Sequence, residues 1–243
     1  RRTMHETFTV TQVRGENDRT QTLIFDHELP SQPGQFVMAW LPGVDEKPFS
    51  IAAADPLTLL VVAVGPMSEA MHRLEAGDRL WVRGPLGQGF RLPDAPGDKR
   101  VLLAGGGYGV APLRFLADRA RRAGCAVDVC IGAGAVGDVL WVEAFERLCA
   151  SVVITTEDGS LGTAGLVTDA AEAVIRARTP DAVYACGPVP MLEAVERQCL
   201  RHDLPHQLSW EAHMRCGIGL CGSCELEGRD GWLACRDGPV SFG

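Results

Sequence analysis

The sequence predicts three parts: an N-terminal antiparallel β-barrel, a doubly wound parallel α/β domain and a small C-terminal cysteine-rich module. Short alternating or apolar runs, separated by Gly, Pro, Asn and Asp, extend from Phe8 to Val82. From Arg100 onwards, apolar strand-like runs alternate with helical segments, and four cysteines then gather near the C-terminus. We therefore predict domains at residues 1–97, 98–210 and 211–243.

Composition and charge narrow the classes of partner. The 243 residues are 46% hydrophobic, and 31 acidic side chains against 23 basic ones give a net charge of −8. Such a chain is not expected to bind nucleic acid or an anionic membrane surface. The longest apolar runs, such as 57–64, have the length of a strand, and the polar start Arg1–His5 lacks the apolar stretch of a signal peptide. We expect a cytoplasmic protein.

The first part should contain six strands and one short helix. The helix is predicted over Ser68–Glu75, with Ser68 as its N-cap and Gly77 just beyond its end. The predicted strands are Phe8–Val13, Gln21–Asp26, Gln35–Leu41, Phe49–Ala53, Leu57–Val64 and Arg79–Arg83.

Two short segments of the barrel stand out chemically. Lys47-Pro48-Phe49-Ser50 places a cation, a rigid proline and a hydroxyl at the mouth of a predicted strand, where they could hold a flavin ring edge and a phosphate. The alternative is an ordinary turn into a strand. The segment Gly84–Phe90, with three glycines and a proline, predicts a sharply turning loop or a linker between domains.

The second part begins with a buried parallel-type strand, Val101–Ala104, followed by the glycine-rich turn Gly105–Gly109 and the helix Val110–Ala123. This order presents backbone N–H groups and a helix N-terminus to a diphosphate. The further predicted elements are the strands Ala126–Ile131, Ser151–Thr155, Ala182–Cys186 and Gln207–Trp210 and the helices Val139–Leu148, Leu166–Ala177 and Pro190–Arg201.

Three loops of this domain should meet at the carboxyl edge of its sheet. Gly105, Gly107 and Gly109, followed by Ala111-Pro112, form a variant of the nucleotide-binding loop. The segments Glu157–Thr163 and Cys186–Pro188 follow two other strands. Ligands of open parallel sheets bind at this edge, so we predict a dinucleotide site. A tight strand-to-helix connection remains the alternative for the glycine turn alone.

The loops also predict a preference for NADH over NADPH. The loop after the second strand, Ile131–Gly137, contains no cation for a 2′-phosphate, and Glu157 and Asp158 follow the third strand. A carboxylate at that place repels a phosphate and accepts hydrogen bonds from a free ribose hydroxyl. The alternative is that both side chains only cap a turn into Gly159.

Cys216, Cys221, Cys224 and Cys235 have the spacing C-x4-C-x2-C-x10-C, interleaved with glycines. Thiolates are the ligands that iron–sulfur clusters require, and small residues allow backbone N–H groups to reach the sulfurs, so this spacing favours a [2Fe–2S] cluster. Disulfides fit poorly because the chain has nine cysteines, an odd number. Zinc is the remaining alternative, although only one C-x2-C pair is present.

The segments Lys47–Ser50, Gly105–Pro112 and Cys186–Pro188, followed by the cysteine cluster, together resemble the ferredoxin reductase superfamily. The C-terminal tail is similar to that of the electron-transfer subunit of NAD-linked, two-subunit dihydroorotate dehydrogenase. The resemblance implies FAD at Lys47, Pro48, Phe49, Ser50, Val62, Val64, Gly65 and Ser68, NAD(H) at Gly105, Gly106, Gly107, Gly109, Pro112, Glu157, Asp158, Cys186, Gly187 and Pro188, and the cluster at Cys216, Cys221, Cys224 and Cys235. Lys47 replaces the arginine of the family and lacks its bidentate fork.

The resemblance also implies an electron-transfer function in pyrimidine biosynthesis. Nicotinamide transfers two electrons as hydride, an iron–sulfur cluster takes one at a time, and flavin handles both, so FAD is expected between NAD(H) and the cluster. No catalytic residue is expected in this chain. Dihydroorotate should be oxidised on an FMN-containing partner subunit, in a heterotetramer with two copies of each chain.

Other partners and classes stay open at this point. With the same cofactors, the chain could be the small or diaphorase subunit of an NADH-dependent ferredoxin:NADP reductase, a cytoplasmic hydrogenase or a sulfide dehydrogenase. A redox sensor or a zinc-stapled binding module is a further class. We expect the cluster end to face the partner, since the tail from Arg215 to Phe242 is rich in apolar residues. These are Ile218, Leu220, Leu226, Trp232, Leu233, Val240 and Phe242.

Overall fold

The computed structural model describes residues 4–243, so residues 1–3 of the polar N-terminus, where no signal peptide is expected, lie outside the described residues. The chain divides into two compact units. The first consists of Arg1–Gly89 and Ala212–Pro239, and the second of Phe90–Glu211 and Val240–Gly243. The cysteine-rich segment therefore belongs to the same unit as the N-terminal part, and the last residues return to the second unit.

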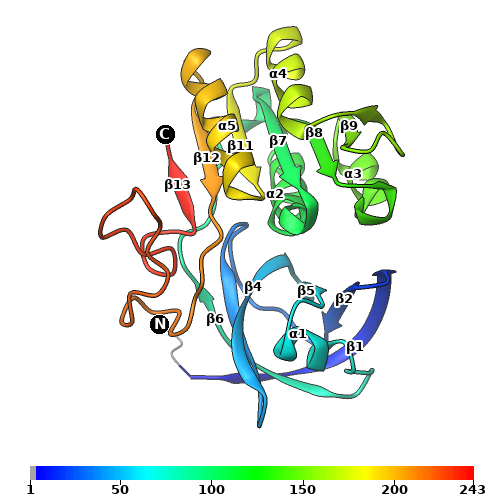
Figure 1. Cartoon of the computed structure of the whole chain (residues 1–243), viewed down its shortest axis with the longest axis vertical. Helices are drawn as coiled ribbons and strands as arrows, with labels where there is room; N and C mark the ends of the chain where they lie inside the picture. Colours follow the sequence, from blue (N-terminus) through cyan, green and yellow to red (C-terminus); the bar gives the residue numbers. More distant parts are fainter. Residues whose placement is uncertain (1–3) are drawn as a thin grey trace. The chain divides into compact units, whose positions relative to one another are not determined.

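In the first unit, the described residues form a closed antiparallel barrel of six strands, as predicted. Its strand order is β1-β2-β5-β4-β3-β6 (Figure 1). Fully buried side chains such as Phe8, Leu23, Ile51 and Leu59 fill its interior. The strands are β1 (Glu6–Asn17), β2 (Thr20–Phe25), β3 (Phe36–Leu41), β4 (Asp45–Ala54), β5 (Leu57–Val62) and β6 (Arg79–Leu86).

Three local predictions in the barrel are wrong. Strand β4 begins at Asp45, so Lys47–Phe49 lies within a strand that pairs with β3 and not at its mouth. Helix α1 spans only Pro66–Met71 with Gly65 as its N-cap, which places Ser68 inside the helix. Strand β6 continues to Leu86 because that residue still pairs with β3, so Gly84 and Pro85 lie in a strand and not in a turning loop.

The second unit contains a seven-stranded sheet of order β10-β9-β8-β7-β11-β12-β13 within the described residues (Figure 1). Neighbouring strands from β10 to β12 run parallel, as predicted, whereas β13 joins the edge in the antiparallel direction. The sheet is therefore mixed. The strands are β7 (Arg100–Gly106), β8 (Ala126–Ala133), β9 (Ser151–Thr156), β10 (Thr163–Ala164), β11 (Ala182–Cys186), β12 (His206–Ser209) and β13 (Val240–Phe242).

Helices cover both faces of this sheet. From β7 the chain proceeds to β8 and β9 on one side and returns to β11 and β12 on the other, so right-handed crossovers place α2 with α3 and α4 with α5 on opposite faces. Helix α3 begins three residues later than predicted, and the others match to within one residue at each end. The helices are α2 (Val110–Arg122), α3 (Val142–Leu148), α4 (Val167–Ala177) and α5 (Val189–Arg201), with short 3₁₀ turns at η1 (Pro96–Asp98), η2 (Gly107–Gly109) and η3 (Val136–Asp138).

The cysteine-rich segment has little regular structure of its own and packs against the barrel. Phe36 and Met38 of β3 form a buried cluster with Met214, Leu233 and the thiols Cys224 and Cys235. At Gly217, whose φ is +68°, an added Cβ would meet Met38 and Leu86 at 2.9–3.3 Å, so only glycine permits this close approach. The barrel thus supplies the hydrophobic core that this short segment lacks.

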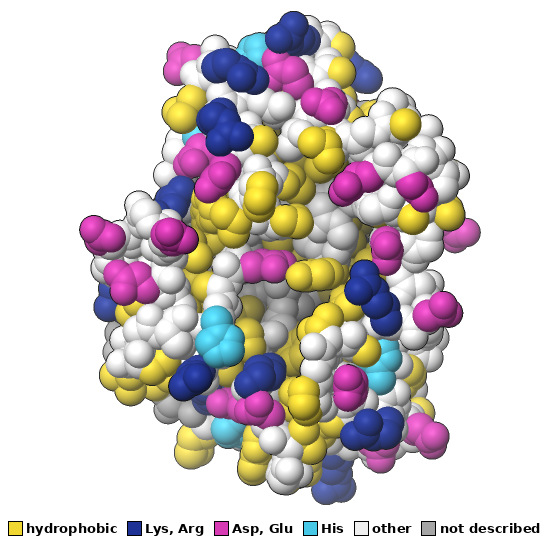
Figure 2. Space-filling view, viewed as in Figure 1, with side chains coloured by type: hydrophobic (Ala, Val, Ile, Leu, Met, Phe, Trp, Pro, Cys, Tyr) yellow, Lys and Arg dark blue, Asp and Glu magenta, His cyan; other side chains and the backbone are white. Residues whose placement is uncertain are grey.

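The surface charges and the helices agree with the composition. Acidic and basic side chains are interspersed over the face shown in Figure 2. Within residues 4–243, no helix is long and apolar enough to cross a membrane.

Candidate functional site

The four predicted cluster cysteines lie in the segment that packs on the barrel, where they form two pairs. The Sγ atoms of Cys224 and Cys235 lie 3.2 Å apart, and the thiols of Cys216 and Cys221 are hydrogen-bonded to one another. The first pair is buried, whereas Cys221 is exposed and Cys216 half-buried. Three of the intervening glycines, Gly217, Gly219 and Gly222, have φ between +68° and +80°, so the loop bends in a way that other residues rarely permit.

Backbone N–H groups of this loop point at the sulfurs. Leu220 donates to Cys216 Sγ at 3.3 Å, and Gly219 donates to Cys235 Sγ at 3.1 Å. The Ser223 hydroxyl lies 3.2 Å from Cys221 Sγ and, with backbone donors, lowers the pKa of that thiol to about 6. Burial acts to raise the pKa of Cys216, but backbone donors hold it below its ordinary value. Burial, together with Cys224, raises the pKa of Cys235 to about 12.

The donor set fits an iron–sulfur cluster of two irons. Two thiolates per iron complete the coordination of such a cluster, and the four cysteines form two pairs with N–H donors around them. Across residues 4–243, no three His, Cys, Asp or Glu side chains converge on a single ion position. A structural zinc site requires four ligands around one point, whereas these four thiols form two pairs.

The apolar residues of the tail divide into buried and exposed groups. Leu233 and Val240 are buried. Trp232 packs against the hydrophobic core that contains Phe36 and Met38. The Trp232 ring leaves no room for a side chain at Gly238. Trp232 is therefore part of the packing of this segment and a poor candidate for a partner contact. Ile218 and Leu220, beside the exposed Cys221, are 43% and 81% exposed.

The predicted flavin stretch Lys47–Ser50 runs along β4 opposite β3, with all four side chains half-buried. The alternation of a strand places Lys47 and Phe49 on one face and Pro48 and Ser50 on the other. Lys47 Nζ lies 2.6 Å from the carboxylate of Asp45, and this contact holds the pKa of Asp45 below its usual range. The strand therefore offers a cation and a ring on one face and a hydroxyl on the other.

The second part of the predicted flavin site lies between β5 and α1. Val62 ends β5, Val64 is 76% exposed, and Gly65 caps the helix. The hydroxyl of Ser68 is buried and accepts hydrogen bonds from the N–H groups of Val64 at 2.9 Å and Gly65 at 3.2 Å. Through these hydrogen bonds, the Ser68 side chain holds the backbone of Val64 and Gly65 in place.

The predicted nicotinamide loops meet at the point where the strand order of the sheet reverses. Gly105 at the end of β7 pairs with Cys186 at the end of β11, and the loops that follow are in backbone contact. An added Cβ at Gly109 would collide with the Cys186 carbonyl, and one at Gly187 would lie 3.1 Å from the nitrogen of Gly106. The remaining predicted residues of these loops, Gly107, Pro112 and Pro188, lie in η2, in α2 and at the N-cap of α5.

This reversal of strand order is where open α/β sheets bind nucleotides. Helix α2 begins directly after the glycine turn, so its first N–H groups face the crevice. Cys186 is buried, and burial, with Glu211 nearby, raises the pKa of its thiol to about 12. A thiol with a raised pKa is a poor nucleophile.

Glu157 and Asp158, after β9, have different roles in the structure. Asp158 accepts hydrogen bonds from the backbone N–H of Ser160 at 2.9 Å and from its hydroxyl at 2.6 Å, and these bonds lower the pKa of Asp158. Asp158 thus caps its own turn. Glu157 is exposed, and its backbone N–H bonds to Ala133 at the end of β8.

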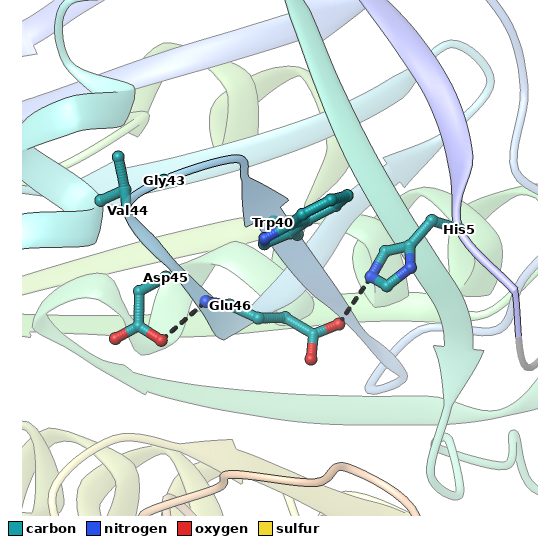
Figure 3. A pocket seen from close by; sticks show the side chains of 6 residues that line it. All are labelled: His5, Trp40, Gly43, Val44, Asp45 and Glu46. Carbon is teal, nitrogen blue, oxygen red and sulfur yellow. Dashed lines mark hydrogen bonds and ion pairs between the residues drawn. The ribbon is translucent and has the colours of Figure 1, made fainter.

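Two features were missed by the sequence analysis. Glu211, two residues after the end of β12, accepts a hydrogen bond from Tyr108 of the glycine turn at 3.3 Å. Its position directly after the last predicted strand was the available signal. The other is a barrel pocket of about 330 Å³ (Figure 3). It is lined by His5, Trp40, Gly43, Val44, Asp45 and Glu46.

Comparison with known proteins assigns a family. The profile of the iron–sulfur cluster binding domain of dihydroorotate dehydrogenase B matches residues 211–242. A probable dihydroorotate dehydrogenase B (NAD⁺) electron transfer subunit of Methanopyrus kandleri is 42% identical over 95% of this chain and 87% of its own length. A protein of the same description from Thermococcus kodakarensis is 40% identical over 99% of this chain and 97% of its own length.

Solved structures agree on the fold. A structure described in connection with flavin-based electron bifurcation by the NADH-dependent reduced ferredoxin-NADP oxidoreductase has a TM-score of 0.85 and 26% identity, over 97% of this chain and 87% of that one. The ferredoxin reductase of carbazole 1,9a-dioxygenase has a TM-score of 0.70 and 23% identity, over 82% and 66%. The similarity over the full length of curated relatives establishes that this chain belongs to the family of dihydroorotate dehydrogenase B (NAD⁺) electron transfer subunits.

Proposed function

We propose that this chain carries electrons between NAD(H) and a catalytic subunit that oxidises dihydroorotate to orotate, using FAD and a [2Fe–2S] cluster. The observation that carries the proposal is the pairing of Cys216 with Cys221 and of Cys224 with Cys235 in a segment packed on the barrel. The similarity to relatives described as electron transfer subunits supports the choice of partner.

The first unit supplies residues for the flavin and the cluster, and the second unit supplies those for the nucleotide. Lys47–Ser50 and the Val62–Ser68 loop of the barrel would hold FAD, which exchanges electrons singly or in pairs when bound. Gly105–Gly109 and Cys186–Pro188 would hold NAD(H). Burial raises the pKa of the Cys186 thiol, which would therefore stay neutral beside the nucleotide. The four cysteines would hold the cluster, and their loop directs N–H groups at the sulfurs.

The catalytic partner is expected to contact the exposed end of the cysteine loop. Cys221, the most accessible of the four thiols, lies beside the exposed side chains of Ile218 and Leu220. An electron leaving the cluster must cross a short distance, so this apolar surface suits a protein contact. We propose an FMN-containing partner, a heterotetramer with two copies of each chain, and a cytoplasmic location.

The isolated chain should oxidise NADH with an artificial acceptor but should not turn over dihydroorotate. The reason is that the residues proposed in this chain would bind one flavin, one nucleotide and one cluster, and dihydroorotate would bind to the partner. Steady-state assays with and without the catalytic subunit test this expectation, and NAD-linked dihydroorotate oxidation should appear only in the mixture. Dihydroorotate oxidation by the single chain would refute the assignment.

A second candidate function follows from the match to the reduced ferredoxin-NADP oxidoreductase structure, which covers 97% of this chain. In that case the chain would be the small subunit of an NADH-dependent ferredoxin:NADP reductase. The two candidates differ in partner and not in cofactors. Co-purification of the native protein, followed by mass spectrometry of the bound chain, distinguishes them.

The nucleotide site should prefer NADH to NADPH. Glu157→Arg should lower the ratio of kcat/KM for NADH to kcat/KM for NADPH by about tenfold, or ~1.4 kcal/mol. The exposed carboxylate of Glu157 repels a 2′-phosphate, whereas a cation there attracts it. Steady-state kinetics with both nucleotides measure the ratio. Glu143→Arg on α3 is the control, because it makes the same charge change at an exposed helical site. If the NADH-to-NADPH ratio of kcat/KM were equal in the Glu157→Arg and Glu143→Arg variants, Glu157 would not be the residue that sets the preference.

A further inference from the structure

Arg83 is a buried cation in the middle of an apolar barrel strand. It follows Leu80, Trp81 and Val82 on β6, and only 8% of its surface is exposed. A buried guanidinium is costly unless its charge and its N–H groups have partners, so the contacts of Arg83 indicate its role.

The guanidinium of Arg83 joins a barrel carboxylate to the backbone of a cysteine in the predicted cluster loop. Its Nε and Nη2 donate to the two oxygens of Glu46 at 3.1 and 3.0 Å, in a bidentate pair. Nη2 also donates to the carbonyl oxygen of Cys216 at 3.0 Å. One buried side chain thus holds the peptide of a predicted cluster ligand against the barrel wall.

Glu46 is fixed on its other side by His5. The Nε2 atom of His5 lies 2.9 Å from Glu46 Oε1, and the His5 ring packs against Trp40 with centroids 5.1 Å apart (Figure 3). Burial acts to raise the pKa of Glu46, but Arg83 and His5 hold it below its ordinary value. Glu46 therefore faces Arg83 as a carboxylate, and its own charge opposes that of the guanidinium.

We propose that Arg83 is a positioning residue that raises the reduction potential of the cluster, and that Glu46 limits this effect. The inference rests on the proposed [2Fe–2S] cluster. Reduction adds one negative charge to the cluster, and a nearby buried cation stabilises the reduced form. The hydrogen bond to the Cys216 carbonyl holds that charge at the backbone of the residue that supplies the thiolate, and the carboxylate of Glu46 partly cancels it.

The two partners should shift the midpoint potential in opposite directions. Arg83→Gln removes the cation and leaves the carboxylate, so the potential of the cluster should fall. Glu46→Gln leaves the cation uncompensated, so the potential should rise. An EPR-monitored redox titration of the loaded protein at a fixed pH measures both shifts, with iron content determined on the same samples.

Arg14 and Glu16 of β1 provide the matched control pair. They form an ion pair of 2.7 Å in the same unit, and Glu16 accepts a second hydrogen bond from Thr22 as Glu46 does from His5. Arg14→Gln and Glu16→Gln should leave the potential at its wild-type value. Shifts of the same sign in the Arg83 and Glu46 variants would show that the pair serves only folding and would overturn the inference.

The test separates this inference from the proposed function. Wild-type protein without iron or without the EPR signal of a reduced cluster would refute the proposed cluster itself. If Arg83→Gln does not retain iron, Glu46→Gln carries the test, because it keeps both the shape of the side chain and the guanidinium. An unchanged or lowered potential in Glu46→Gln would overturn the role of the pair.

Discussion

Cys221→Ser should remove the iron from the protein and leave its flavin in place. A hydroxyl is a poor ligand for iron compared with a thiolate, and Cys221 forms one of the two thiol pairs of the loop. The proposed FAD residues belong to barrel strands and to the α1 loop, so the barrel should hold the flavin without the cluster. Iron should fall from about two per chain to none, as measured by metal analysis alongside the flavin absorbance.

Cys149→Ser is the matched control for this variant. Cys149 is a half-buried free thiol at the end of α3, in the other unit, and burial raises its pKa to about 12. The control should retain both iron and flavin. Loss of iron and flavin together in a soluble, folded Cys221→Ser protein would show that the two cofactors do not have independent sites.

Gly109→Ala should weaken both the second unit and its binding of NADH. The added methyl group would collide with the Cys186 carbonyl and lie 2.6–2.9 Å from its carbon and the next backbone nitrogen, all of them backbone atoms that cannot rotate away. Relief requires the ends of β7 and β11 to separate, at a cost of about 2 kcal/mol and a fall in Tm of roughly 5 °C. The same displacement opens the nucleotide crevice, so KM for NADH should rise about tenfold.

Gly97→Ala serves as the control for Gly109→Ala. Gly97 lies in η1 of the same unit, and a Cβ added there meets nothing within 4 Å. Thermal unfolding and NADH oxidation with an artificial acceptor measure both quantities in each variant. If Gly109→Ala matched the control in Tm and in KM, the close packing of the two loops would not matter for the nucleotide site.

The local patterns of the chain predicted most of the second unit. Strand Ala182–Cys186 was predicted with its exact bounds, and the helix after the glycine turn differs by one residue. Apolar runs of strand length and helical segments with glycine at their ends are local signals, which neighbouring residues determine. The cysteine spacing is also local, and it led to the same family that the curated relatives establish.

Predictions in the barrel failed where strand pairing or a loop hydrogen bond outweighed local propensity. Gly84 and Pro85 are turn residues by composition, yet they lie in a strand because the residue that follows, Leu86, pairs with Phe36. Ser68 is a strong N-cap residue, but its hydroxyl bonds the loop before the helix and Gly65 takes the cap. Propensity is weaker than pairing and burial at such positions.

The order of the barrel, the nucleotide sheet and the cysteine cluster follows from local patterns of the chain, because strand period, glycine turns and ligand spacing extend over a few residues. Which segments share a core depends on how distant parts of the chain fold together. The tertiary structure placed the cysteine loop on β3, returned Val240–Phe242 to the sheet, and joined Arg83 to Glu46, 37 residues away, and to Cys216, 133 residues away. The physical reason is that a buried cation and a short loop without its own core are stable only against partners that the folded chain supplies.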